Sequence, residues 1–419
     1  MSKQEKRVPE LRFKGYVEEW EQRKFVDNVE EILDYRGKTP TKFGMEWGNQ
    51  GYLVLSALNV KDGYIDKSVE AKYGDQKLFE MWMGERRLEK GDILFTTEAP
   101  LGNVAQIPDD EDYILNQRTV AFKTNSRKTN RDFLAQLLRS PHVQERLNAN
   151  ASGGTAKGIG MKEFSKLTTY VSTQVEEQEE IGKLFSHLDY LIALHQQKLD
   201  KLKLLKKGLM QQLFPDIHKK LPLLRFANFE DDWEERKVSE FATEYFGGGT
   251  PKTSNEEYWN GDIPWIQSSD LIEHHISDVN LKKRITRKGF DNSPIKLIPK
   301  DSIAIVTRVG VGKLALMQYE YTTSQDFLSL CNLQVYKLFG AYALYLLIQK
   351  ELHAVQGTSI KGITKQELLK KVILIPFDKE EQRKIGDSLQ EIDILLKRYQ
   401  SKIVELKVLK QTYSQKMFV

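Results

Sequence analysis

The fold is decided by a short stretch that occurs twice. Residues 176–182 read Glu-Glu-Gln-Glu-Glu-Ile-Gly, and residues 380–386, which lie 204 positions further on, read Glu-Glu-Gln-Arg-Lys-Ile-Gly. Each stretch opens a run of about 39 residues without proline, 176–214 and 380–418, in which charged residues surround a regular apolar repeat. A proline-free, periodic run of this length predicts a long α-helix at the end of each half of the chain.

The apolar repeat within both runs has a period of seven. Its members are Ile181, Leu188, Leu202 and Leu209 in the first run and Ile385, Ile392, Leu406 and Tyr413 in the second, with His195 and Tyr399 at the same spacing. Leucines three residues later are expected to complete the seam: Leu184, Leu191, Leu205, Leu395 and Leu409. Apolar residues one position further on are expected to widen the stripe: Phe185, Ile192, Leu199, Leu213, Leu389, Leu396, Ile403 and Met417. An apolar repeat over about five heptads is typical of a coiled coil, and each helix would be about 58 Å long.

The repeat alone is compatible with two arrangements of these helices. Each helix could pack only on its own domain, or the two could pair with each other in antiparallel orientation. We favour the pair because a helix of about five heptads is longer than one domain of this size can cover. Polar seam residues such as Lys198 and Lys402 can fix the register of such a pair at a cost in stability.

A second repeat opens each half of the chain. Residues 9–24 and 222–237 are identical at 8 of 16 positions, among them Trp20 and Trp233. Weaker echoes lie further on, such as Gly-Lys-Thr-Pro at 37–40 and Gly-Gly-Thr-Pro at 248–251. The chain is therefore a tandem duplication of about 200 residues that forms two domains of one kind. We expect both tryptophans to be core residues.

The body of each copy mixes strands and helices. Short aromatic and β-branched runs separated by Gly, Pro, Asn and Asp predict strands and turns, and residues 132–147 and 341–355 predict helices. The expected fold class is therefore α+β, with two tandemly repeated α+β domains separated by two long helices that form an antiparallel coiled coil. The expected segments are domain 1 at 1–173, helix 1 at 174–215, domain 2 at 216–377 and helix 2 at 378–419.

Composition excludes several classes of protein. Of 419 residues, 40% are hydrophobic, which is enough for real cores and too much for a disordered chain. No run approaches the roughly 18 apolar residues of a membrane span, and no apolar leader follows Met1. The single cysteine, Cys331, can form no internal disulfide, which fits a cytoplasmic protein. The net charge of +4 permits a nucleic-acid partner without showing one.

Catalytic motifs are missing from the sequence. There is no Walker loop, Gly-x-x-x-x-Gly-Lys-Ser/Thr, and no Asn/Asp-Pro-Pro-aromatic loop of a DNA methyltransferase. The histidine pair His274-His275 does not indicate a metal site, since adjacent side chains point to different faces. Asp216, Glu235 and Lys237 resemble the active-site set of metal-dependent nucleases, but the first copy has Gln22 in place of Glu235. We expect no enzyme, no metal and no cofactor in this chain; the alternatives are a non-catalytic coiled-coil scaffold and, least favoured, the nuclease.

Three segments of the second copy carry a resemblance to a known family. They are Gly-Gly-Gly-Thr-Pro-Lys-Thr at 247–253, Tyr-Trp-Asn-Gly-Asp-Ile-Pro-Trp-Ile at 258–266 and Ser-Ser-Asp-Leu at 268–271. With the duplicated Glu-Glu-Gln helix start, they resemble the target-recognition domain of type I restriction–modification specificity (S) subunits, and the resemblance covers the whole chain in the family's order. The first copy departs from the pattern at 48–51, Gly-Asn-Gln-Gly, and at 170–173, Tyr-Val-Ser-Thr.

The resemblance implies a DNA-recognition subunit without a catalytic centre. Such subunits bind double-stranded DNA at an asymmetric bipartite site, one half-site per recognition domain, with a spacer set by the helices. They hold two methyltransferase (M) subunits, and two restriction (R) subunits join for restriction. These partners use S-adenosylmethionine, ATP and magnesium, so that the specificity subunit needs no cofactor of its own.

DNA-contacting residues are expected in the loops that match the family. Arg and Lys suit guanine edges, Asn and Gln suit adenine edges, and Ser, Thr and Lys suit phosphates. The first-copy candidates are Arg36, Lys38, Thr39, Lys42, Ser56, Asn59, Asn116, Gln117, Arg118 and Lys157. The second-copy candidates are Lys252, Thr253, Gln267, Ser268, Ser269, Asp270, Arg308, Lys313, Gln325 and Lys361. Glycine and proline at Gly249, Pro251, Gly310 and Gly312 are expected to shape turns.

Overall fold

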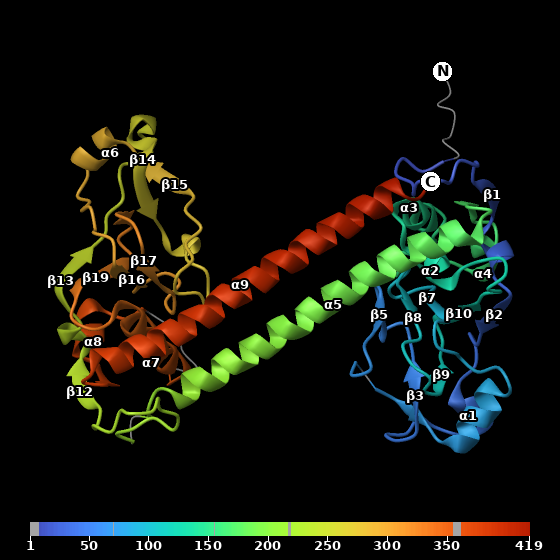
Figure 1. Ribbon diagram of the computed structural model, residues 1–419, viewed down its shortest axis with the longest axis horizontal. Helices are drawn as coiled ribbons and strands as arrows, with labels where there is room; N and C mark the ends of the chain where they lie inside the picture. Colours follow the sequence, from blue (N-terminus) through green and yellow to red (C-terminus); the bar gives the residue numbers. More distant parts are fainter. Residues whose placement is uncertain (1–7, 70, 155, 217–218, 355–361) are drawn as a thin grey trace. The chain divides into compact units, whose positions relative to one another are not determined.

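The computed structural model describes residues 8–69, 71–154, 156–216, 219–354 and 362–419 (Figure 1). The chain divides into two compact units: unit 1 comprises Met1–Gln196 with Ser401–Val419, and unit 2 comprises Gln197–Gln400. The division runs through both long helices, α5 (Val175–Gln212) and α9 (Lys379–Lys416), each of 38 residues. Each unit therefore contains one part of each long helix.

A four-stranded antiparallel sheet forms the centre of each unit. In unit 1 its order is β2 (Glu31–Asp34), β10 (Thr119–Lys123), β7 (Ile93–Thr96) and β8 (Val104–Gln106). In unit 2 the order is β13 (Ala242–Gly247), β19 (Phe327–Leu333), β16 (Ser302–Val306) and β17 (Leu314–Met317). The identical order follows from the duplication and agrees with the α+β class.

Successive residues of the central strands enter two different cores. Ile93 and Phe95 pack with α2 (Arg131–Arg139), whereas Leu94 packs with α1 (Gln76–Met83) and the second sheet. In unit 2, the neighbouring residues Ile303 and Ala304 of β16 likewise belong to two different hydrophobic cores. Because side chains alternate along a strand, a sheet covered on both faces needs apolar residues at every position, which these strands have.

A second, three-stranded sheet lies against the first in each unit. Its strands are β6 (Tyr73–Gly74), β3 (Tyr52–Leu55) and β9 (Tyr113–Leu115), or β15 (Lys283–Ile285), β14 (Trp259–Ile266) and β18 (Thr322–Thr323). Two-stranded pairs complete each unit: β1 (Glu21–Lys24) with β11 (Thr168–Val171), and β12 (Glu234–Lys237) with β20 (Val372–Ile375). Unit 1 also has a hairpin of β4 (Val60–Lys61) and β5 (Tyr64–Ile65).

The predicted helix at 132–147 consists of two helices. Helix α2 ends at Arg139, and Pro141 begins α3 (Pro141–Ala149), because proline lacks an N–H and suits only the first turn of a helix. The counterpart α7 (Lys337–Ala354) has no proline and is continuous over 18 residues. The short helices α4 (Met161–Phe164), α6 (Arg287–Asp291) and α8 (Lys365–Lys370) complete the two units.

A buried carboxylate anchors the start of each long helix. Glu177 accepts hydrogen bonds from the Arg12 guanidinium at 2.6 Å and from the Trp20 indole at 3.2 Å. Glu381 accepts the equivalent bonds from Arg225 at 2.7 Å and from Trp233 at 3.4 Å. Both tryptophans are buried, at 2% and 3% exposure, which confirms that they are core residues. The two stretches that repeat most clearly in the sequence are therefore partners in space.

The glutamine after each buried glutamate ties the helix to the body of its unit. The Gln178 amide accepts a hydrogen bond from Asn130 N at 2.8 Å and donates one to Ser172 O at 2.8 Å. Gln382 repeats this arrangement with Tyr336 N and Pro376 O, also at 2.8 Å. The Glu-Glu-Gln motif thus serves as a docking element for the helix start.

Within each unit, the parts of α5 and α9 lie side by side and antiparallel. The contacting pairs are Phe185–Phe418 and Asp189–Lys410 in unit 1, and Lys198–Tyr399 and Lys206–Asp393 in unit 2. Residue numbers rise along α5 as they fall along α9. This confirms the antiparallel pair and contradicts the alternative in which each helix packs only on its own domain.

The buried second position of the seam is formed by the residues expected to widen the stripe, not by the leucines one position earlier. Leu205, Leu395 and Leu409 are exposed and Leu184 and Leu191 are half-buried. Of the residues four after the first seam position, Ile192 is half-buried and the others are buried: Phe185, Leu199, Leu213, Leu389, Leu396, Ile403 and Met417. Alternating spacings of three and four residues follow one face of a helix in either order. A period of seven therefore could not show which of the two orders the seam uses. Of the first positions, Ile181, Leu188, Ile385, Ile392 and Leu406 are buried, and Leu202, Leu209 and Tyr413 are half-buried.

Two lysines occupy this second position, Lys206 and Lys410. They stand 204 residues apart, as do their partners Asp393 and Asp189, so each unit contains one copy of the same ion pair. In unit 2 the pair is completed by Tyr342, whose hydroxyl donates to Asp393 at 2.6 Å.

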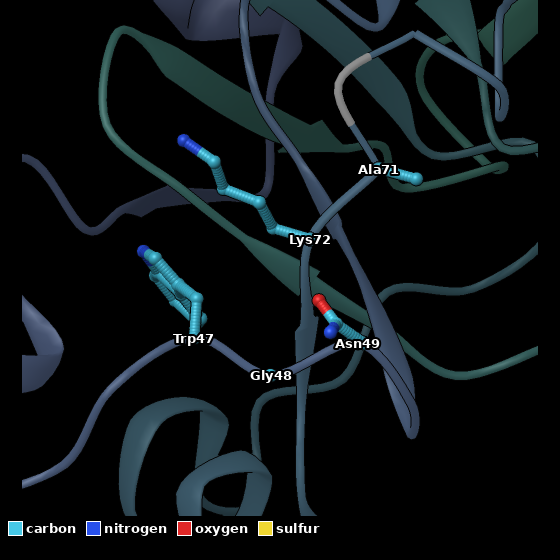
Figure 2. A pocket seen from close by; sticks show the side chains of 5 residues that line it. All are labelled: Trp47, Gly48, Asn49, Ala71 and Lys72. Atoms are coloured by element: carbon cyan, nitrogen blue, oxygen red, sulfur yellow. The ribbon is translucent and has the colours of Figure 1, made fainter.

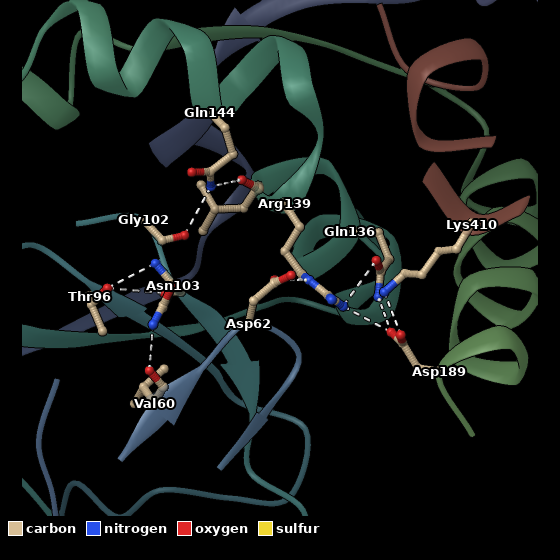
Figure 3. Close-up of polar contacts among 11 residues, drawn as sticks. Val60, Asp62, Thr96, Gly102, Asn103, Gln136, Arg139, Gln144, Asp189 and Lys410 are labelled. Atoms are coloured by element: carbon tan, nitrogen blue, oxygen red, sulfur yellow. Dashed lines mark hydrogen bonds and ion pairs between the residues drawn. The ribbon is translucent and has the colours of Figure 1, made fainter. Parts of the chain in front are cut away.

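In unit 1, Asp189 is the centre of a wider network (Figure 3). Its carboxylate binds Arg139 at 2.9 Å and Gln136 at 3.2 Å, and Arg139 in turn binds Asp62 at 2.6 Å. Burial would raise the pKa of Asp189, but the charges of Arg139 and Lys410 outweigh burial and hold this pKa below its ordinary value. The network joins both long helices to α2 and to the β4–β5 loop.

Replacing this carboxylate tests its contribution to the stability of unit 1. Asp189→Asn leaves Lys410 without its carboxylate partner and Arg139 with Asp62 alone, and it is expected to destabilise unit 1 by roughly 2–3 kcal/mol at pH 7, less than for a fully buried pair. Because the folded-state pKa is lowered, the difference from the wild type should shrink below about pH 4. Hydrogen exchange of the α2 amides measures both effects.

The matched control is Glu179→Gln, which removes an exposed pair with Lys183 on the same helix. This substitution should lower the free energy of unfolding of unit 1 by less than about 1 kcal/mol. Equal effects of the two substitutions would contradict a special role for the Asp189 network.

Candidate nucleic-acid interface

Four loops of each unit meet where strands of the two sheets end. In unit 1 they are residues 36–42 after β2, 56–59 after β3, 97–103 between β7 and β8, and 116–118 between β9 and β10; we name them loop cluster 1. In unit 2 the equivalent loops are 248–253, 267–270, 307–313 and 324–326, which we name loop cluster 2. Almost all of the predicted DNA-contacting residues lie in these eight loops.

Backbone and side-chain hydrogen bonds join the loops of cluster 1. From the 116–118 loop, Asn116 N donates to Leu55 O at 3.0 Å and the Gln117 amide donates to Lys38 O at 2.6 Å. Arg118 O accepts from Thr97 N at 2.8 Å, and Thr97 O accepts from Ile159 N at 2.9 Å, which brings Lys157 to the same place. The 116–118 loop is therefore the hub of the cluster.

Cluster 2 has an equivalent set of bonds around residues 324–326. Ser324 N donates to Ile266 O at 2.9 Å, the Thr250 hydroxyl donates to the Gln325 amide oxygen at 2.6 Å, and Thr307 N donates to Asp326 O at 2.8 Å. Ile363 N donates to Thr307 O at 2.9 Å, as Ile159 does in cluster 1. The two clusters share one framework although their sequences have diverged.

The shared framework also aligns the loop after β3 with the loop after β14. Asn59 and Asp270 occupy the same position: the Asn59 side chain accepts from Ser56 N at 3.1 Å, and the Asp270 carboxylate accepts from Gln267 N at 3.1 Å. Both are buried, at 1% and 0% exposure. Both side chains hold their loop in this structure, so a contact of either with DNA stays a prediction that would require these hydrogen bonds to open.

The other candidates are at or near the surface. Exposed residues are Lys42, Arg118, Lys157, Lys252, Thr253, Ser269, Arg308 and Gln325. Half-buried residues are Arg36, Lys38, Thr39, Ser56, Asn116, Gln117, Gln267, Ser268 and Lys313. Lys361 lies outside the described residues. Their contact with DNA stays a prediction, which the positions of the loops make geometrically possible.

The two clusters differ in how their cations are balanced. In cluster 1, Arg36 pairs with Asp34 at 2.6 Å and Arg118 pairs with Glu98 at 3.0 Å. In cluster 2, Lys252 and Arg308 have no acidic partner among the described residues. Exposed ion pairs are weak, so Arg36 and Arg118 can exchange their carboxylates for a phosphate or a base at little cost.

Two structural features of loop 248–253 were not visible in the sequence. A Cβ on Gly248 would lie 2.0 Å from Ser324 O, so only glycine allows this loop to contact the hub. The Trp265 indole donates to Gly249 O at 2.9 Å, and the Trp259 indole donates to Lys252 O at 3.4 Å. The tryptophans of the 258–266 motif therefore position the Gly-Gly-Thr-Pro-Lys loop.

Neither a metal centre nor a membrane segment is found in the part of the chain that the structure describes. No group of three or more His, Cys, Asp or Glu side chains is arranged there to hold a metal ion. Asp216 lies 3.9 Å from Lys350, and Glu235 is an exposed residue of β12. None of the helices described is long and apolar enough to cross a bilayer.

Two copies of one α+β fold, each with a cluster of loops rich in amide, hydroxyl and basic side chains, define a two-domain DNA-recognition protein. The family described as the type I restriction modification DNA specificity domain matches residues 17–204 and again residues 230–407. The chain therefore belongs to this family of specificity subunits, which are non-catalytic and depend on other subunits for methylation and restriction.

Individual relatives agree with the family match. The chain is 25% identical over 393 residues to a protein named as the MjaX type I restriction enzyme specificity subunit of Methanocaldococcus jannaschii, covering 90% of this chain and 88% of that protein. The MjaIX specificity subunit of the same organism is 32% identical over 181 residues, covering 42% of this chain and only 41% of that protein. The fold resembles the crystal structure of the S subunit from M. genitalium, with a TM-score of 0.66, 16% identity and coverage of 98% and 99%.

The loop-holding role of the buried acid in cluster 2 can be tested directly. Asp270→Ala removes the acceptor for Gln267 N and is expected to destabilise unit 2 by about 1–2 kcal/mol. Asp270→Asn should be nearly neutral, because Asn59 performs the same function in unit 1. Urea unfolding, with hydrogen exchange of the Gln267 amide, measures the difference. Equal effects of Ala and Asn would show that the carbonyl-type acceptor is not what holds the loop.

Proposed function

We propose that the chain reads an asymmetric bipartite DNA site within a type I restriction–modification complex, with one half-site for each loop cluster. The observation that carries this proposal is the pair of clusters themselves. Equivalent hydrogen bonds hold both on one framework, and the framework presents different side chains in the two units. Different readers on a common framework favour two different half-sites and hence a non-palindromic target.

The hub loop supports this difference between the half-sites. Gln117 and Gln325 occupy the same position, and an amide there suits an adenine edge in both units. The next residue is Arg118 in cluster 1 and Asp326 in cluster 2. A guanidinium favours the acceptors of guanine, whereas a carboxylate accepts from the amino group of cytosine. Arg118 and Asp326 carry opposite charges at the same position of the framework, so they do not suit the same base. The two clusters should therefore read different bases at this position.

Two exposed apolar patches on the long helices support two methyltransferase partners. The exposed apolar residues are Tyr190, Val408 and Leu409 in unit 1 and Ile394, Leu204 and Leu205 in unit 2, each exposed at 38% or more. Each of these residues has its counterpart in the other unit 204 positions away: Tyr190 and Ile394, Leu204 and Val408, and Leu205 and Leu409. Exposed apolar patches mark protein–protein contacts. A patch that occurs once in each unit suits two copies of one partner.

The remaining partners and cofactors follow from the family. We propose that the methyltransferase subunits bind S-adenosylmethionine and that two restriction subunits supply the ATP- and magnesium-dependent reactions. This chain would then contribute recognition and assembly and hold no cofactor. The complex would act in the cytoplasm, where the cell's DNA is accessible.

Reconstitution with the methyltransferase subunit of the same system tests the proposal. The purified chain alone should neither methylate nor cut DNA in the presence of S-adenosylmethionine, ATP and magnesium. With the partner, it should form a complex with two methyltransferase copies that methylates a bipartite motif. Leu204→Glu should leave one copy bound by native mass spectrometry, whereas Lys207→Glu, an exposed control on the same helix, should leave two.

Three results would contradict the proposal. Magnesium-dependent cleavage by the chain alone, abolished by Asp216→Ala, would establish the nuclease. A complex without sequence-specific DNA binding would establish a coiled-coil scaffold. Loss of both methyltransferase copies in Leu204→Glu would refute two independent patches.

A further inference from the structure

Each unit has an exposed lysine at the same position of its second sheet. In unit 1, Val54 N of β3 donates to Lys72 O at 2.9 Å, which places Lys72 opposite Val54. In unit 2, Lys283 of β15 lies opposite Trp265 of β14. Val54 and Trp265 correspond, because each precedes the residue whose carbonyl accepts from the hub loop. The sequence shows no repeat here, so only the strand register reveals that the two lysines are equivalent.

Both lysines lie beside tryptophans and close to a loop cluster. The Lys283 ammonium lies 5.5 Å from the centre of the Trp259 ring and 5.7 Å from that of Trp265, the residue that holds Gly249. In unit 1, Lys72 and Trp47 line an open hollow of about 430 Å³ together with Gly48, Asn49 and Ala71. Figure 2 shows the side chains of Lys72 and Trp47 extending to the same side of this hollow.

The surroundings favour an anion as the ligand of these lysines. Both side chains are exposed, and neither has an acidic partner among the described residues. In unit 2 the ammonium itself lies over the two rings, a cation–π arrangement that holds the charge in place while the side chain stays exposed. In unit 2 the lysine covers the tryptophan faces, which argues against base stacking there. An ammonium is a point charge that suits phosphate rather than a particular base edge.

We propose that Lys72 and Lys283 each bind a phosphate of the DNA backbone beside the half-site of the neighbouring loop cluster. The proposal rests on the DNA-reading function proposed above and adds two contacts that carry no sequence information. Both units have a positive charge at this position of the second sheet, although their neighbouring DNA-reading loops differ. Such a shared charge suits the phosphate backbone, which is the part of DNA that does not vary with sequence. The two lysines would position the duplex, and the loop clusters would select the bases.

The salt dependence of DNA binding by the complete complex with methyltransferase distinguishes such contacts. Fluorescence anisotropy is measured on one labelled duplex of arbitrary sequence and on one that carries the methylated motif. Lys72→Ala and Lys283→Ala should each lower the slope of log affinity against log salt by about 0.9. A fourfold rise in salt should then weaken each variant about threefold less than the wild type. The ratio of specific to non-specific affinity should not change.

The control substitutions are at exposed lysines close in sequence to Lys72 and Lys283. Lys282→Ala changes the residue next to Lys283. Because successive side chains of an extended chain alternate, Lys282 should point to the opposite face from Lys283. Lys77→Ala changes an exposed residue of α1. Both should keep the wild-type slope, as should the charge-preserving Lys72→Arg and Lys283→Arg. An unchanged slope in the alanine variants would overturn the proposal, and so would a fall in the specificity ratio, which would indicate a base contact. A wild-type complex that binds both duplexes equally would instead refute the proposed DNA-reading function.

Discussion

The structure depends on two carboxylates that are removed from water at the beginning of the long helices. A buried carboxylate without partners costs several kcal/mol, so the chain must bring donors to Glu177 and Glu381. Those donors, Arg12 and Trp20 or Arg225 and Trp233, come from the opposite end of each copy. This requirement closes each copy on itself. It explains why the beginning and end of the copies resemble each other more than the parts between them.

Neither copy completes its own core. The core of unit 1 includes Met417 and Phe418 from the end of the second copy, and the core of unit 2 includes Met210 and Leu213 from the end of the first. Equivalent backbone bonds, Leu11 N to Lys416 O and Leu224 N to Gln212 O, join each helix end to the copy that it enters. The pairs Asp189–Lys410 and Asp393–Lys206 set the register of this exchange. The duplicated sequence thus specifies two units that each need both halves of the chain.

The sequence predicted the features that local pattern determines. The duplication, the α+β class, the long helices and the buried tryptophans were all visible as repeats or periodicity. Both candidate second positions of the seam were visible as apolar residues, but which of them is buried was not, because steps of three and four residues lie on the same helical face. The loop-holding roles of Asn59 and Asp270 were also hidden, since an amide or carboxylate in a loop has the same appearance whether it faces solvent or accepts a backbone N–H. Lys72 and Lys283 could not be matched, because strand register is a property of pairing between distant segments.

The central claim is that two independent readers share one scaffold. Methylome sequencing of a chimaera tests it most directly: residues 1–170 are exchanged for those of a relative with a different target, and the long helices are kept. The account predicts that one half of the methylated motif changes while the other half stays the same. A motif in which both halves change together, or one that is continuous or palindromic, would contradict two readers.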